Sequence, residues 1–69
     1  LDVSNKTDLL VVDCSFNELT TLTVENNNSL TELYCHINSI SALNLNNNNS
    51  LTKLQCFANE LINLDVSDI

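Results

Sequence analysis

The sequence predicts a small all-β solenoid in which three coils of 21 residues stack on one another. Three observations favour this fold class: a repeat at fixed spacing, short runs in which apolar and polar residues alternate, and many asparagines without any glycine. The chain has 69 residues, a length that permits one domain at most. We therefore treat residues 1–69 as a single domain of repeated coils.

The repeat is clearest in the cysteines, because Cys14, Cys35 and Cys56 lie 21 residues apart. Aligning residues 1–21, 22–42 and 43–63 brings seven columns into agreement, and residues 64–69 begin a fourth copy. Besides the cysteines, the matching columns are Leu1/Leu22/Leu43, Val3/Val24/Leu45, Leu9/Leu30/Leu51, Val12/Leu33/Leu54, Asn17/Asn38/Asn59 and Leu19/Ile40/Leu61. Random sequence would scatter these apolar positions, so the copies are expected to share one structure.

Each copy contains two short runs with the alternation of a half-buried strand. In one run the inward Leu54 and Cys56 alternate with outward residues, which are Lys53, Gln55 and Phe57. Leu43 and Leu45 alternate in the same way in the other run. One coil cannot bury its own apolar side, so each strand should pair in parallel with its equivalent one coil away, at about 4.8 Å. We expect little or no α-helix. The expected centres of the main strands are Asp13, Tyr34 and Gln55.

Asparagine is expected to form the bends between strands. The chain has 13 asparagines and no glycine, and asparagine tolerates left-handed backbone at modest cost. The predicted bends lie at Asn17, Asn38 and Asn59 and at the asparagine-rich stretches 26–28 and 46–49. In the first set, the side-chain amides should also bond the backbone of neighbouring coils, which gives them a structural role.

The cysteines are interpreted as structural. Cys14, Cys35 and Cys56 recur once per coil on the inward side of a strand, so they form a line and do not converge on one metal ion. Their count is odd, and a buried free cysteine behaves as a small hydrophobe. We expect reduced, buried thiols and no metal site.

The block L-x-x-L-x-C-x-x-N-x-L spans residues 30–40 and 51–61 and, with Val12 in its second apolar position, residues 9–19. This block resembles the leucine-rich repeat signature in its 21-residue bacterial form, in which cysteine replaces the third leucine, and is most similar to internalin-like surface proteins. The resemblance covers the whole chain. It implies a curved right-handed solenoid with a parallel sheet on the concave side, used for protein–protein interaction or adhesion by a secreted or cell-surface protein. Because both ends carry the tetrapeptide LDVS and neither carries a polar cap, we expect a fragment of a longer array.

Composition excludes several other functions. The net charge of −7 would repel nucleic acid and anionic lipid, and no apolar run is long enough for membrane insertion. Without glycine there is no phosphate-binding loop or dinucleotide fingerprint, so no cofactor is expected. The one histidine, His36, points away from Cys35 on a strand, which argues against a catalytic pair. We expect that the chain is not an enzyme.

The outward side chains of the main strands are the candidate binding residues. Tyr34, His36 and Phe57 should form one exposed aromatic patch, and exposed aromatic residues are common at recognition sites. The alternative is that they are cross-strand pairs that stabilise the sheet. Phe16, Ile37 and Ala58, just past the strands, are expected to tuck under the edge. The full candidate set is Asp13, Ser15, Glu32, Tyr34, His36, Lys53, Gln55 and Phe57.

Two rival functions stay open at this point. The coils could be a structural spacer in an envelope protein, with no binding role of their own. Ice or crystal-surface binding is suggested by several threonines, but only Thr31 and Thr52 share a column, so no regular grid forms. The leading hypothesis is a module that binds a protein or cell-surface ligand.

Overall fold

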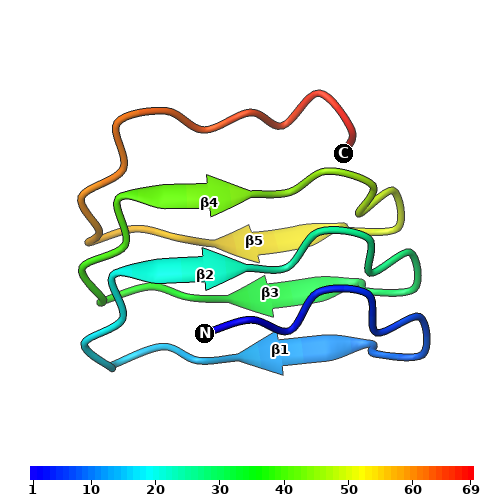
Figure 1. The fold of residues 1–69 in the computed structure, drawn as a ribbon, viewed down its shortest axis with the longest axis horizontal. Coiled ribbons are helices and arrows are strands. Elements are labelled where there is room, and N and C mark those ends of the chain that lie inside the picture. The colour runs from blue at the N-terminus through cyan, green and yellow to red at the C-terminus, as the bar shows by residue number, and fades with distance from the viewer.

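The computed structural model describes residues 1–69, with five strands of three residues each and no helix (Figure 1). The prediction of an all-β chain with parallel sheets is confirmed. No segment therefore forms a helix that could cross a membrane. The strands are β1 (Val11–Asp13), β2 (Thr21–Thr23), β3 (Glu32–Tyr34), β4 (Ala42–Asn44) and β5 (Lys53–Gln55).

The strands form two parallel sheets, with the orders β1-β3-β5 and β2-β4. The odd-numbered strands run in one direction and the even-numbered strands run back (Figure 1). In both sheets each residue pairs with the residue one repeat later in the chain. Val12 pairs with Leu33, and Leu22 pairs with Leu43. Single bridges from Asp2 to Thr23 and from Ala42 to Asn63 extend the second sheet on both sides.

Strands β1, β3 and β5 end at Asp13, Tyr34 and Gln55, the residues that were expected at their centres. Each strand is centred one residue earlier, at Val12, Leu33 and Leu54, so the expected centres are wrong by one position. The backbone bonds continue past the strand end, because the Cys14 amide donates to the Tyr34 carbonyl oxygen at 2.9 Å and the Phe16 amide donates to the His36 carbonyl oxygen at 3.0 Å. At Phe16 the backbone is left-handed, so the extended conformation ends there although its amide still bonds the neighbouring copy.

The core lies between the two sheets and is formed by the repeated apolar columns. The second coil is the most completely buried, with Leu30, Leu33 and Ile40 at 0 % exposure. The matching Leu9 and Leu54, in the first and third coils, are only partly buried. The middle copy, residues 22–42, lies between the other two and is therefore the best covered. The remaining core residues are Val12, Leu22, Val24, Cys35, Leu43, Leu45 and Leu51.

Candidate functional site

Two kinds of bend join the strands, and we name them by their residues. The asparagine bend comprises residues 4–8, 25–29 and 46–50, and the aromatic bend comprises residues 14–20, 35–41 and 56–62. In the asparagine bend the left-handed residues are Asn5, Asn26 and Asn47, with φ of 59°, 62° and 60°. This is the residue type expected at such a position.

In the aromatic bend, asparagine does not occupy the left-handed position, contrary to expectation. Phe16, Ile37 and Ala58 have φ values of 58°, 58° and 54°. The asparagine that follows each of them is used for its side chain. Asn38, for example, donates from Nδ2 to the carbonyl oxygens of Cys14 at 3.0 Å and Cys35 at 3.1 Å. Because this amide must point inward, the preceding residue makes the turn.

The column of Asn17, Asn38 and Asn59 connects successive coils. Asn59 repeats the contacts of Asn38, donating to the Cys35 carbonyl oxygen at 2.9 Å while its Oδ1 accepts the Ile40 amide at 3.0 Å. Asn17 donates to the carbonyl oxygen of Cys14 in its own coil at 2.9 Å. These amides satisfy backbone groups that would otherwise be unpaired inside the stack.

A second column of inward asparagines was not predicted from the sequence. Asn27 and Asn48 in the asparagine bend are both fully buried. The Asn27 Nδ2 donates to the carbonyl oxygens of Val3 and Val24 at 2.9 Å, and its Oδ1 accepts the Lys6 amide at 2.7 Å. The first copy has Lys6 at this column, so the repeat alone does not distinguish these two asparagines from their exposed neighbours.

The cysteines lie just past the ends of β1, β3 and β5, and all three are free thiols. Cys35 is buried, whereas Cys14 and Cys56 are half-buried at the outer coils. Burial raises the pKa of Cys35 to about 12 and also raises the pKa of Cys14 and Cys56. The thiols therefore stay protonated at neutral pH, which makes them poor nucleophiles.

Tyr34 packs within the sheet and does not join the other aromatic residues. Its hydroxyl donates to the Glu32 carboxylate on the same strand, and the Nζ of Lys53 lies 5.7 Å from its ring centroid. The hydrogen bond to Glu32 holds the pKa of Tyr34 above its usual value. Gln55 is its register partner on β5. These contacts are those of a cross-strand packing residue.

His36 and Phe57 come together as expected, and Phe16 joins them. The rings of His36 and Phe57 are stacked, with centroids 4.6 Å apart and an interplanar angle of 12°. The Phe16 ring meets His36 edge-on, at 5.3 Å and 80°. We call these three residues the aromatic cluster. They come from three successive coils.

The aromatic cluster is open to solvent. Phe16 is 70 % exposed and Phe57 is 58 % exposed. The expectation that Phe16, Ile37 and Ala58 tuck under the sheet edge is wrong, because all three side chains are exposed at their left-handed positions. In the repeat alignment His36 and Phe57 share one position, and Phe16 occupies the next position of its copy. The alignment alone therefore does not group Phe16 with them.

Asp13 and Ser15 lie beside the aromatic cluster at the end of β1. Asp13 Oδ1 accepts the Ser15 amide at 3.1 Å and the Ser15 hydroxyl at 2.6 Å. These bonds, with a smaller contribution from His36, hold the pKa of the Asp13 carboxyl below its usual range. Both bonds use the same oxygen, which leaves Oδ2 open to an external donor.

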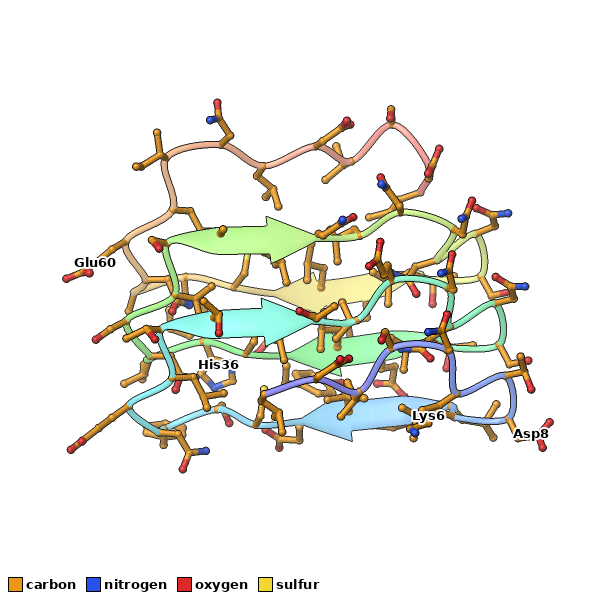
Figure 2. All side chains as sticks on the ribbon, viewed as in Figure 1. Lys6, Asp8, His36 and Glu60 are labelled. Carbon is orange, nitrogen blue, oxygen red and sulfur yellow. The ribbon has the colours of Figure 1, made fainter.

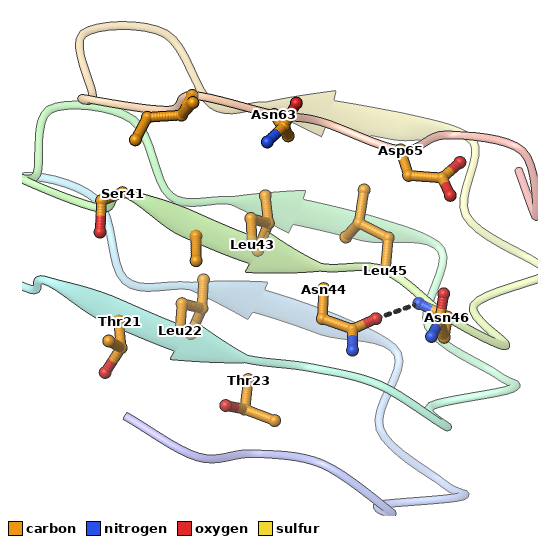
Figure 3. Close-up of a pocket in the computed structure, with 12 residues that line it drawn as sticks. Thr21, Leu22, Thr23, Ser41, Leu43, Asn44, Leu45, Asn46, Asn63 and Asp65 are labelled. Carbon is orange, nitrogen blue, oxygen red and sulfur yellow. Dashed lines mark hydrogen bonds between the residues drawn. The ribbon is translucent and has the colours of Figure 1, made fainter.

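A shallow groove lies on the other sheet, over β2, β4 and residues 62–65 (Figure 3). Thr21, Thr23 and Asn44 give it polar groups, and Asn44 Oδ1 accepts the Asn46 amide at 2.9 Å. None of the candidate binding residues lines it. The sequence did not single out this surface, because its exposed columns differ from one copy to the next, as Thr21, Ala42 and Asn63 do.

The side chains form no group of three or more His, Cys, Asp or Glu residues that could hold a metal ion. Comparison of the chain with known protein families, with curated proteins and with solved structures found no significant match.

Proposed function

We propose that this chain is a leucine-rich repeat solenoid that binds a protein partner through the aromatic cluster beside the β1-β3-β5 sheet. Two structural features support the solenoid. Strands pair only with strands one repeat away, as Leu33 does with Leu54. In addition, inward asparagines such as Asn38 connect neighbouring coils at the same position of the repeat. A role at the cell surface or outside the cell follows from the resemblance to bacterial surface repeats.

The exposed aromatic cluster is the observation that carries the binding role. Phe16 and Phe57 are both more than half exposed and gather with His36, and clustered exposed apolar side chains are more informative about binding than single ones. Exposed aromatic rings are the usual anchors of a protein interface.

The same site gives little support to catalysis. His36 is the only histidine, and the rings on either side of it are hydrocarbon. The Cys35 thiol is buried and stays protonated. A nucleophile needs a base within hydrogen-bond reach, and neither residue has that arrangement. We therefore propose a non-enzymatic module.

The spacer function is the alternative, and the contacts of Tyr34 favour it. If every aromatic side chain on this face acted as Tyr34 does, the face would stabilise the sheet and bind nothing.

The binding function and the spacer function predict different effects of removing the aromatic cluster. The test is Phe16→Ser with Phe57→Ser in the full-length protein. Ile62→Ser is the matched control, because Ile62 is 83 % exposed outside the cluster.

Thermal stability and attachment to cells and protein-coated surfaces would be measured for each variant. For a binding module, the double variant loses attachment with an unchanged melting temperature, and the Ile62 variant keeps both. Unchanged attachment in the double variant would contradict the binding function and favour the spacer.

A further inference from the structure

We propose that the partner presents arginine, and that the aromatic cluster together with Asp13, Glu18 and Glu60 forms its guanidinium-binding site. This inference rests on the proposed binding function and names the chemistry of the partner. It follows from where the charges lie, from which ring surfaces are open and from the free oxygen of Asp13.

The aromatic bend carries negative charge without a cation of its own. Glu18 and Glu60 occupy the same repeat position, two coils apart, and both are exposed. The chain has only two cationic side chains. Lys53 is held over the Tyr34 ring, and Figure 2 shows Lys6 at the end opposite Glu60. A partner that neutralises this bend must bring the positive charge itself.

The aromatic cluster offers flat surfaces to such a cation. His36 lies between the other two rings, and its Nδ1 is buried without a hydrogen-bond partner. Phe16 and Phe57 keep most of their surface in solvent. A guanidinium group is planar and weakly hydrated, so it stacks on an aromatic ring better than an ammonium group does. The site should therefore prefer arginine to lysine.

Asp13 supplies an anchor for the charge. Its Oδ1 is bound to Ser15, and Oδ2 has no partner. A carboxylate oxygen beside aromatic rings can accept one N–H of a guanidinium whose plane covers a ring. Glu18 and Glu60 lie farther along the bend and act through their charge. Together these groups fit a basic peptide segment that crosses the bend.

The probe is a fluorescent peptide of alternating arginine and glycine, added to the full-length protein. Two matched peptides replace arginine by lysine or by citrulline, which keeps the shape and removes the charge. The arginine peptide should bind about tenfold more tightly than the citrulline peptide, from one stacking contact and one or two screened ion pairs. The lysine peptide should bind with intermediate affinity.

Three variants locate the site. Phe16→Ser with Phe57→Ser should remove the preference for arginine over lysine. Glu18→Gln with Glu60→Gln should weaken binding and reduce its salt dependence. Asp8→Asn with Asp68→Asn removes the same charge in and beside the asparagine bend. The Asn47 amide now donates to Asp68 Oδ2 at 3.1 Å, and the side-chain amide oxygen of the variant could still accept that bond. This control should bind as the unaltered protein does.

Equal weakening in the two charge variants would mean attraction by net charge alone and would overturn the proposal. Equal binding of the arginine and citrulline peptides would also overturn it. The outcomes separate this site from the broader proposed function. If the phenylalanine variant loses attachment but the unaltered protein does not prefer the arginine peptide, the chain is a protein-binding module whose partner has other chemistry. If the unaltered protein prefers the arginine peptide but the phenylalanine variant keeps its attachment, the guanidinium site stands and the adhesion function does not.

Discussion

Asn38 reaches back one coil to Cys14, donating from Nδ2 to its carbonyl oxygen at 3.0 Å. The same nitrogen donates to the carbonyl oxygen of Cys35 in its own coil at 3.1 Å, and Oδ1 accepts the Leu19 amide at 3.0 Å. One side chain therefore satisfies backbone groups of two coils. Its removal should affect the stack more than removal of a surface amide.

Asn38→Ala should lower the free energy of unfolding by about 2 kcal/mol, because it leaves part-buried backbone groups without partners. Asn17→Ala is the matched control. Its amide bonds only its own coil and is exposed, so a smaller loss is expected. Urea denaturation followed by circular dichroism would measure both. Equal losses in the two variants would show that the contact between coils contributes nothing.

Ala58→Gly should stabilise the protein by up to about 1 kcal/mol, because glycine adopts left-handed backbone without strain. Ala58 has a φ of 54° and an exposed side chain, so little packing is lost. Ala42→Gly is the control, since Ala42 is exposed in the extended strand β4. That variant should be destabilised by about 0.5–1 kcal/mol. Thermal unfolding of both would contradict this account if Ala58→Gly melted lower than the unaltered protein.

The sequence was sufficient to predict the strands and their register. Its 21-residue period fixes which strands pair, because only that offset brings Leu22 beside Leu43 and Leu33 beside Leu54. Alternation of apolar residues then gives the inward side of each strand. Strand ends were less certain, since the backbone bonds between copies continue past β1 as far as Phe16 and past β3 as far as Asn38.

The bends and the aromatic cluster were harder to predict. Propensity favours asparagine at a left-handed position, but Asn38 is needed inside the stack, so Ile37 takes that conformation. Phe16 therefore faces outward, and its contact with His36 depends on a turn that propensity argues against. Asn38 can satisfy buried carbonyl groups and Ile37 cannot, and this difference decides which of the two takes the left-handed conformation. It depends on contacts between neighbouring copies, which appear only in three dimensions.

Unfolding should become easier at alkaline pH because of the cysteines. Burial raises the pKa of Cys35 to about 12, whereas an unfolded thiol titrates near about 8.5. The folded state then holds its proton where the unfolded state releases it. The stability from the neutral thiol is fully present below the unfolded pKa and is lost as pH rises from that value through the folded pKa.

Urea midpoints measured between neutral pH and about pH 10.5 should fall across this window. Cys35→Ala removes the titrating group and should give a shallower decline, although it is less stable at neutral pH. An equally steep decline in Cys35→Ala would assign the effect to other groups.

Tyr34→Ser should lower stability and leave attachment unchanged, which distinguishes Tyr34 from the aromatic cluster. The change removes the contact with Lys53 and the hydrogen bond to Glu32, and a cross-strand pair of this kind contributes about 0.2–1 kcal/mol. Tyr34→Phe keeps the ring beneath the ammonium group and should recover most of the loss. Gln55→Ser, at the register partner on β5, controls for simple shortening of a side chain on this face. Thermal unfolding and attachment would be measured together. If Tyr34→Ser abolished attachment at unchanged melting temperature, Tyr34 would belong to the binding surface, and that surface would extend from the aromatic cluster onto β3.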